Sequence, residues 1–387
     1  MLNHPSVEAA YDEWRASVAA IAPARALPDP QFTFQADVWS TLMSFMPGLM
    51  FDFMGSAKRS AMAREASAES TVQYRTFVTA VLTTAAEVRK AWIDLAFVDE
   101  SIRLREAAVG SLNQSSALAN AGYETGRGMA TLESQMRVAN EIAKAHAEID
   151  ALRDRRAAAR SRFKSAMGFA PGEADPAWPL QGLGPTALPG EDELWRRAQA
   201  SNPELGRMKA MVEMAVAGVE VARSAARPDF SLGAMANLVN SQPDPRMIRA
   251  VASVTLPVWR EKIAANVTAA KARNDAADAR VRAELLDVAA ELAQGLYMVR
   301  ENDRMIAYID GTALPNLERI SASAEAGYQT GASGAEMMSE TRIMELDLRS
   351  ERIAALRERE IAATDLSLLT AGIAPPGLPL TAGAATP

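Results

Sequence analysis

Apolar residues recur every seven positions along two long stretches of the chain. They are Val81, Val88, Leu95, Ile102 and Val109 in the first stretch, and Leu285, Leu292, Val299 and Ile306 in the second. Such a repeat is typical of helices that pack along their whole length, as in coiled coils. The pattern predicts helices over residues 56–121 and 262–326, each roughly 100 Å long at 1.5 Å per residue. No compact domain accommodates helices of that length.

Shorter helical patterns stand on either side of these two stretches. They predict helices over residues 5–26, 129–167, 203–226 and 335–370, and one more helix directly before Asn202. Gly311 and Pro315 interrupt the second long stretch, so we expect a kink near them. The returning helices have Glu/Arg-rich faces, which we interpret as solvated. Examples are Glu351, Arg352, Arg357, Glu358, Arg359 and Glu360.

Four short segments alternate apolar and polar residues with a period of two, which predicts β-strands. The clearest are residues 31–39 and 229–238, and the weaker partners are 43–53 and 249–258. Each strand is about ten residues long, enough to cross a bilayer when tilted, although a half-buried sheet in water shows the same alternation. A sheet of four strands has two open edges, whose unpaired backbone groups are unfavourable in lipid. A membrane location therefore requires several copies whose strands pair edge to edge into a closed ring.

Two halves of the chain resemble each other. The motif Asn-Ala-Gly-Tyr-Glu-Thr-Gly at 120–126 recurs as Glu-Ala-Gly-Tyr-Gln-Thr-Gly at 325–331. A Pro-Asp pair at 28–29 recurs at 228–229, and Asn3-His4-Pro5 resembles Asn202-Pro203-Glu204. The order of the matches is preserved, which predicts a tandem duplication. A proline- and glycine-rich stretch, residues 175–191, is interpreted as the linker between the two repeats.

Composition excludes several classes of function. The chain has 41 basic and 48 acidic residues, a net charge of −7 and no basic tract, which argues against a nucleic-acid partner. It has no cysteine, so disulfides, thiolate metal sites and cysteine nucleophiles are absent. The only histidines, His4 and His146, are too far apart in sequence to suggest a metal site, and no apolar run reaches the length of a transmembrane helix.

The sequence offers no constellation for catalysis. Zinc-protease, nucleophile-elbow and Walker A motifs are missing, so we expect a protein that is not an enzyme and has no cofactor. The 19 methionines leave one alternative open, because thioethers bind Cu(I). Methionines near the two Gly-Tyr-x-Thr-Gly motifs invite that interpretation, whereas most helix methionines are packing residues. They are Met129, Met136, Met337, Met338 and Met344.

Taken together, these motifs resemble the TolC-like outer-membrane efflux proteins over nearly the whole chain. The resemblance rests on the helix starts at Asn3/Pro5 and Asn202/Pro203, the Ala-Arg-x-x-Pro-Asp motif at 24–29, and the paired motifs ending in Gly126 and Gly331. It implies a mainly α fold with a small β part, in which long coiled-coil hairpins form an α-barrel. It also implies a homotrimer in which four strands per protomer build one transmembrane β-barrel.

The same resemblance implies an organisation along the chain. Residues 1–30 and 170–228 would form equatorial helices and the linker between repeats, and 31–54 and 229–259 the barrel strands. Residues 56–168 and 262–371 would be two periplasmic helical hairpins, and 372–387 a C-terminal tail.

Function and partners follow from the resemblance as well. The implied protein is a passive exit duct of a tripartite efflux pump in the outer membrane, with its helices in the periplasm. Its partners would be a periplasmic adaptor, an inner-membrane pump and outer-membrane lipid. Metal cations, small toxic molecules and secreted proteins all remain possible cargo, with some likeness to the cation-efflux branch. A soluble coiled-coil scaffold is the alternative function.

Two candidate sites follow. The helix-hairpin tips would dock the adaptor, through Gly126, Arg127, Gly128 and Met129 in the first repeat and Gly331, Ala332, Ser333 and Gly334 in the second. Glu336 and Glu340, four residues apart and therefore on one helix face, would line the channel entrance, gate it and select cations. The match is partial, because Met337 occupies a position where the family has a second acid. Both glutamates could instead be ordinary solvated residues.

The start of the chain departs from the family pattern. The second repeat has a helix before Asn202, whereas only Met1 and Leu2 precede Asn3. No basic segment followed by an apolar one stands there, so we expect no signal peptide in this chain. Processing, trimming or a late start of the gene model would each explain that.

Overall fold

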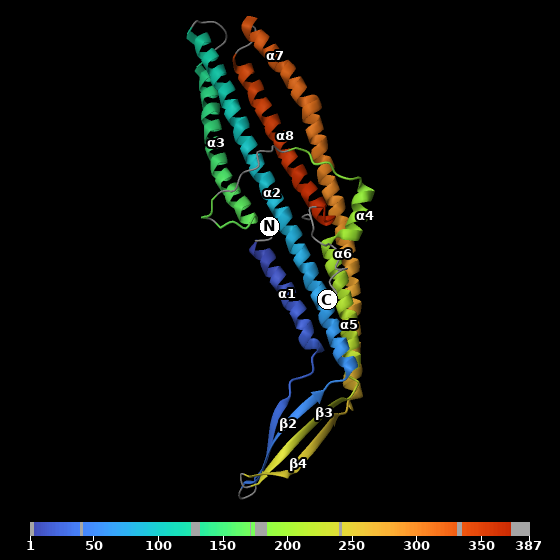
Figure 1. Cartoon of the computed structure of the whole chain (residues 1–387). Coiled ribbons are helices and arrows are strands. Elements are labelled where there is room, and N and C mark those ends of the chain that lie inside the picture. Colours follow the sequence, from blue (N-terminus) through green and yellow to red (C-terminus); the bar gives the residue numbers. More distant parts are fainter. Residues whose placement is uncertain are drawn as a thin grey trace. The chain divides into compact units, whose positions relative to one another are not determined.

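The computed structural model describes residues 4–38, 42–124, 132–170, 172–174, 184–239, 242–330 and 335–372. Helices account for most of these residues, and one antiparallel sheet holds all the described strands (Figure 1). The helices are α1 (Pro5–Arg25), α2 (Ser56–Glu124), α3 (Leu132–Ala166), α4 (Glu191–Ser201), α5 (Pro203–Ser224), α6 (Arg260–Tyr308), α7 (Leu314–Thr330) and α8 (Ala335–Leu369). The strands are β1 (Gln31–Val38), β2 (Leu42–Phe53), β3 (Asp229–Val239) and β4 (Gln242–Thr255).

The chain divides into two compact units. The first, here called the sheet unit, contains the described residues of Glu8–Ala80 and Pro203–Leu286. The second, here called the hairpin unit, contains those of Met1–Val7, Val81–Asn202 and Asp287–Leu378. Both long helices contribute to both units, so each unit is built from the two halves of the chain.

The sheet has the strand order β1-β2-β3-β4, with every neighbouring pair antiparallel. β1 and β2 form one hairpin, β3 and β4 the other, and the two hairpins join through the pairing of β2 with β3. Pairs such as Phe32 with Leu49, Phe51 with Leu232, and Phe230 with Val254 keep the apolar positions in register across all four strands. β1 and β4 are the two edges of the sheet.

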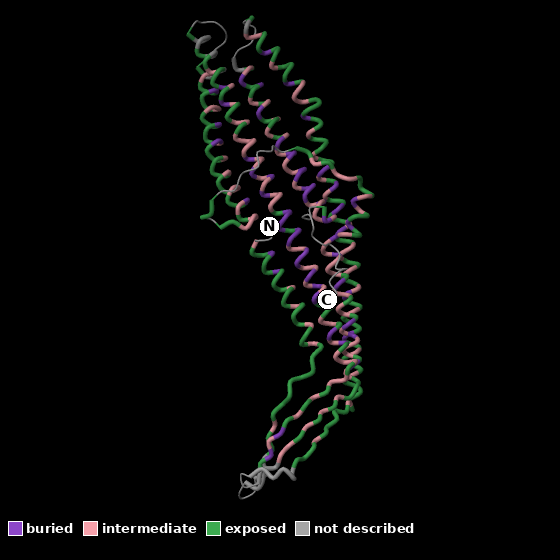
Figure 2. Tube along the Cα trace, in the orientation of Figure 1, coloured by how far each residue is buried: buried purple, intermediate pink, exposed green. Residues whose placement is uncertain are grey.

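Helix packing in the hairpin unit follows the seven-residue repeat. Val81, Leu95 and Val109 are buried on α2, and Leu292 and Val299 are buried on α6. In Figure 2, buried positions recur along α2, whereas the sheet is mostly exposed or intermediate. One core cluster joins α4, α6 and α8, where Leu366 of α8 packs with Leu194, Leu292, Leu296, Val299 and Ala362. A second cluster joins α2 to α3 through Ala91, Leu95 and Phe163.

Most of the helix and strand predictions agree with these bounds, and β4 differs from its prediction. β4 begins at Gln242, seven residues before the predicted start at 249, because Pro243 and Arg249 mask the alternation there, and it ends at Thr255, three residues before the predicted end at 258. The second long helix is interrupted, since Ile309–Ala313 form a π-helical turn between α6 and α7. The sequence predicted an irregularity at this place from Gly311 and Pro315. Pro315 has no N–H and its ring crowds the carbonyl of Gly311, which a wider turn accommodates.

Within the described residues, no helix is both long enough and apolar enough to cross a membrane.

Candidate functional site

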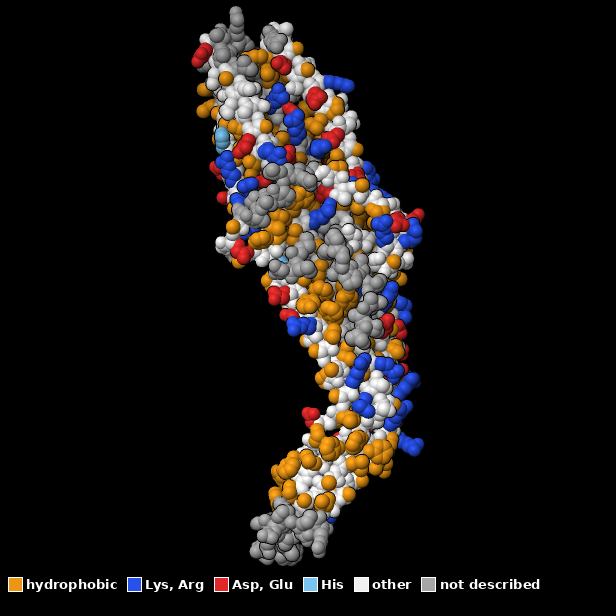
Figure 3. Space-filling model, in the orientation of Figure 1, with side chains coloured by type: hydrophobic (Ala, Val, Ile, Leu, Met, Phe, Trp, Pro, Cys, Tyr) orange, Lys and Arg blue, Asp and Glu red, His pale blue; other side chains and the backbone are white. Residues whose placement is uncertain are grey.

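One face of the sheet is apolar and exposed. Because side chains alternate along each strand and the register aligns the strands, most apolar residues of all four strands fall on the same side. The members with exposed side chains are Phe32, Phe34, Phe45, Leu49, Phe51, Phe53, Phe230, Leu232, Ile248 and Val254. Phe34 and Ile248 each expose 67% of their surface. Figure 3 shows hydrophobic atoms over the sheet. An exposed apolar surface of this kind marks a contact with lipid or with another protein.

The opposite face of the sheet carries mostly polar and small residues, together with Met46, Met50, Met235 and Val251. Asp52 accepts hydrogen bonds from Ser231 Oγ at 2.5 Å and from Gln31 Nε2 at 3.1 Å, which ties β1, β2 and β3 together. Gly48 and Gly233 lie on this face, where an added Cβ would come within 2.8 Å of the neighbouring strand's backbone at Ala234 O and Leu49 O respectively. The sheet therefore has one apolar face and one mostly polar face.

The predicted channel entrance lies at the start of α8. Glu336 and Glu340 both belong to α8, four positions apart along the helix. The Glu340 carboxylate is half exposed, and its Oε1 lies 3.7 Å from Nη1 of Arg137 on α3. Glu345 is more buried and forms ion pairs with Arg342 and Arg349 on its own helix. Of the two predicted acids, Glu340 is therefore partly neutralised within its own chain.

The predicted docking tips fall outside the described residues. These are Gly126, Arg127, Gly128 and Met129, and Gly331, Ala332, Ser333 and Gly334. On either side of them, α2 ends at Glu124 and α3 begins at Leu132, while α7 ends at Thr330 and α8 begins at Ala335.

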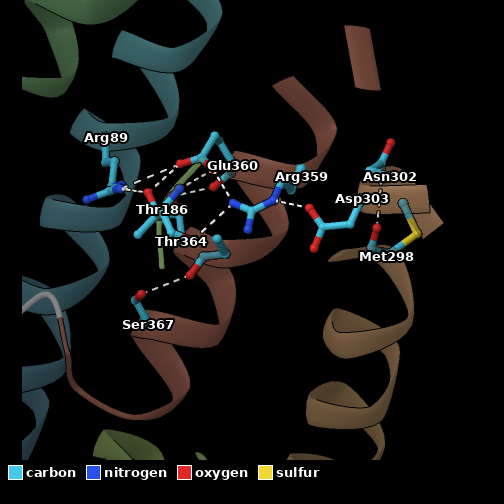
Figure 4. A network of polar contacts seen from close by, with 10 residues as sticks. Arg89, Thr186, Met298, Asn302, Asp303, Arg359, Glu360, Thr364 and Ser367 are labelled. Carbon is cyan, nitrogen blue, oxygen red and sulfur yellow. Dashed lines mark hydrogen bonds and ion pairs between the residues drawn. The ribbon is translucent and has the colours of Figure 1, made fainter. Parts of the chain in front are cut away.

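A buried polar network in the hairpin unit was not predicted from the sequence (Figure 4). Glu360 of α8, whose side chain is only 4% exposed, lies at its centre. Its Oε1 accepts hydrogen bonds from Thr186 N at 2.9 Å and Arg359 Nη1 at 2.6 Å, and its Oε2 accepts one from Thr186 Oγ1 at 2.5 Å. Arg89 of α2 donates to Thr186 Oγ1 at 2.9 Å, and its guanidinium lies 3.8 Å from Glu360.

Arg359 extends this network to α6. Its Nε donates to Asp303 Oδ1 at 2.5 Å, and its Nη1 also donates to the Thr186 carbonyl at 3.1 Å. Burial lowers the pKa of the Arg359 guanidinium, but the hydrogen bonds to Asp303 and Glu360 outweigh it, and the pKa is raised. Two arginines thus balance two carboxylates around one threonine. The network joins the segment before α4 to three helices, α2, α6 and α8.

The prediction that the Glu/Arg-rich face of α8 is solvated is wrong for Arg357, Arg359 and Glu360. Arg359 and Glu360 are buried in the network, and Arg357 is mostly covered. Arg357 donates to Asp94 of α2 at 2.7 Å and lies over the ring of Phe97, 5.6 Å from its centre. These side chains are long enough for their charged ends to reach a partner on a neighbouring alanine-rich helix. A charged pattern that is typical of a water-facing surface therefore lies at a contact between helices here.

Further ion pairs link the helices of this unit. Asp94 of α2 also binds Arg162 of α3 at 3.2 Å, Asp99 binds Arg156 at 2.5 Å, and Lys90 binds Asp365 of α8. The sequence contains no positional signal for such pairs, because partners such as Asp94 and Arg357 are 263 residues apart. They hold α2 against α3 and α8.

The metal interpretation gains no support from this structure. In the part of the chain that the structure describes, no group of three or more His, Cys, Asp and Glu side chains could hold a metal ion. Of the methionines named for copper, Met136, Met337 and Met344 are exposed. His4 forms a hydrogen bond with Ser6 at 2.7 Å, and His146 is exposed.

Comparison with known families and structures gives a consistent result. Residues 194–372 match the model of the outer membrane efflux protein family. This match covers the second half of the chain, from α4 to the end of α8. A comparison with the sequences of curated proteins gave no match.

Solved structures show the fold of the whole chain. The CusC structure, reported with conformational changes accompanying transmembrane channel formation, has a TM-score of 0.80 at 16% identity, covering 95% of this chain and 89% of CusC. The outer membrane protein VceC of Vibrio cholerae has a TM-score of 0.76 at 17% identity, covering 94% of this chain and 92% of VceC. The open state of the MtrE outer membrane channel of Neisseria gonorrhoeae has a TM-score of 0.78 at 17% identity, covering 95% and 86%. The chain therefore has the fold of these outer-membrane proteins.

Proposed function

We propose that this protein is an outer-membrane efflux channel, the exit duct of a tripartite pump. One observation carries the proposal, namely a four-stranded sheet with an apolar face that exposes many large side chains, in the same chain as long packed helices. Lipid is the environment in which such a face is favourable, and the mostly polar opposite face suits a water-filled interior. The likeness of residues 194–372 to the outer membrane efflux protein family supports the same function.

A soluble coiled-coil scaffold is not favoured. It would use the same seven-residue repeats, but it would leave the large side chains of the sheet, such as Phe34 and Ile248, in water. We propose metal cations or small toxic molecules as the cargo, and the described residues favour neither class over the other.

The open edges β1 and β4 support assembly as a trimer. Three copies would supply twelve strands, and pairing β4 of one copy with β1 of the next would close a barrel without unpaired backbone groups. We expect native mass measurement in detergent to give three times the 41.5 kDa of one chain. Cross-linking at low protein concentration is the control for aggregation. A stable monomer that needs no detergent would contradict both the trimer and the channel.

In this assembly the tips at 126–129 and 331–334 would meet the helical hairpins of a periplasmic adaptor. Glycines support this role, because a backbone without Cβ lets another chain approach closely. Glu336 and Glu340, a few residues beyond the second tip, would stand in the narrow periplasmic entrance. Three copies would place a ring of carboxylates there, which attracts cations and disfavours anions.

Replacing Glu336 and Glu340 with alanine is therefore expected to reduce cation preference several-fold in planar-bilayer recordings. Because Arg137 lies 3.7 Å from Glu340, Arg137→Ala is expected to shift selectivity the opposite way, toward cations. Alanine at Glu318 and Glu325, two exposed acids of α7, removes the same charge elsewhere and serves as the control. Unchanged reversal potentials in both entrance variants would rule out the acidic ring.

A further inference from the structure

A cluster of basic side chains lies at one end of the apolar sheet. Antiparallel pairing brings the start of β1 beside the end of β2, the end of β2 beside the start of β3, and the start of β3 beside the end of β4. All four strands therefore join their helices along the same border, as Figure 1 shows. Both the strands and these helix ends belong to the sheet unit.

The sequence segments at this border have a net positive charge, opposite in sign to that of the whole chain. Residues 22–30, 54–62, 222–230 and 256–264 together contain seven basic and three acidic residues, whereas the whole chain has a net charge of −7. The basic residues are Arg25, Lys58, Arg59, Arg223, Arg227, Arg260 and Lys262. We call these seven residues the basic collar. In Figure 3, Lys and Arg atoms gather on the helices next to the hydrophobic sheet surface.

Most of the collar has no acidic partner. Lys58 is paired, with its Nζ 2.7 Å from Asp229 Oδ2. By contrast, the exposed side chains of Arg223, Arg227, Arg260 and Lys262 form no ion pair with any residue that the structure describes. So many unpaired cations next to one another repel each other unless an anion lies between them.

Two arginines of the collar, Arg59 and Arg25, lie close together. Nη1 of Arg59 lies 3.5 Å from the carbonyl oxygen of Arg25, so two cationic residues stand side by side. Nε of Arg59 is buried and has no hydrogen-bond partner. A phosphate or carboxylate from outside the chain would therefore have to bind the Nη groups of Arg59, not its buried Nε.

The chain beside the collar changes polarity in the order that a membrane surface does. Beyond β4, Leu256 and Val258 are 65% exposed, Trp259 is 75% exposed, and Arg260 and Lys262 follow directly. Tryptophan favours the headgroup level, where its ring is partly in apolar and partly in polar surroundings. An apolar strand, an exposed tryptophan and then cations match acyl chains, interface and headgroups in turn.

We infer that the basic collar binds the anionic headgroups of phospholipids in the leaflet next to the helices. The inference rests on the proposed function, since it requires the sheet to lie in a membrane. The ligand chemistry is a phosphodiester held by arginine, whose planar guanidinium binds two phosphate oxygens at once. An acidic surface of a protein partner is the competing occupant. Continuity of the collar with the apolar face favours lipid.

Quenching of Trp259 by brominated lipids tests the inference directly. The full chain is reconstituted into phosphatidylcholine vesicles that contain either brominated phosphatidylglycerol or brominated phosphatidylcholine. The signal of Trp259 is the difference between the native protein and Trp259→Phe, because the chain has six tryptophans. We expect a preference for phosphatidylglycerol of about tenfold at low salt, since each basic residue near a membrane surface contributes severalfold.

The variant R227Q/R260Q/K262Q is expected to reduce this preference to nearly one, and high salt is expected to do the same. The control, K271Q/R273Q/R280Q, removes three exposed cations farther along α6 and is expected to keep the preference. Equal quenching by both lipids in the native protein, or a preference that survives in the collar variant, overturns the inference and leaves a protein partner as the occupant. If neither lipid quenches any tryptophan, the sheet does not enter the membrane and the proposed function itself fails.

Discussion

Replacing Glu360 with alanine is expected to lower the free energy of unfolding of the hairpin unit by about 3–5 kcal/mol. The variant leaves Arg359 buried without one of its two carboxylate partners and removes the acceptor of the Thr186 backbone N–H. A buried charge or donor without a partner costs more than the contact it made. The melting temperature, followed by circular dichroism of the helices, should fall by roughly 6–20 °C.

Glu351→Ala is the matched control, because Glu351 is an exposed glutamate on the same helix and forms no ion pair with any residue in the described part of the chain. Its melting temperature should stay close to that of the native protein. The double variant Glu360→Ala/Arg359→Ala should cost less than the sum of the two single variants, since the residues bind each other. Equal effects of Glu360→Ala and Glu351→Ala would show that the network adds no stability.

Local patterns along the sequence predicted most of the secondary structure. The seven-residue repeat around Val81 and Leu292 reflects helix packing, and the alternation around Phe32 and Phe230 reflects a sheet with two different faces. Both are local signals, because the environment of a whole element repeats along it. The interruption near Gly311 was also predicted, since proline chemistry acts within one turn.

The buried network could not be predicted, because burial of a charged residue depends on which helix covers it. Arg359 and Glu360 have the same sequence surroundings as Glu351, which is exposed. Thr186, Asp303 and Arg89 come from three other segments, so only the tertiary fold brings them together. The predicted channel entrance could be predicted in part. The spacing of Glu336 and Glu340 was readable, whereas the cation beside Glu340 comes from Arg137, which lies 203 positions earlier in the sequence.

Exchanging Ile248 and Arg249 is expected to prevent insertion of the sheet into a membrane. The two residues are neighbours near the middle of β4 and point to opposite faces, Ile248 opposite Ala236 and Arg249 opposite Met235. The variant I248R/R249I keeps composition and net charge but places a cation on the apolar face. An arginine facing lipid near the midplane costs about 2–4 kcal/mol in each copy, or roughly 6–12 kcal/mol for three copies.

The measurement is the fraction of protein that resists extraction with alkaline carbonate after reconstitution into vesicles, with circular dichroism to verify that the long helices are intact. Arg249→Ile alone is the control, because it leaves the apolar face unchanged and is expected to insert like the native protein. If only the exchanged variant fails to insert, the cause is the face on which the arginine lies and not its presence in the strand, since neighbouring side chains of a strand point to opposite faces. Insertion of the exchanged variant at the native level would mean that the apolar face of the sheet does not contact lipid, and would leave its ten exposed large side chains to a protein partner.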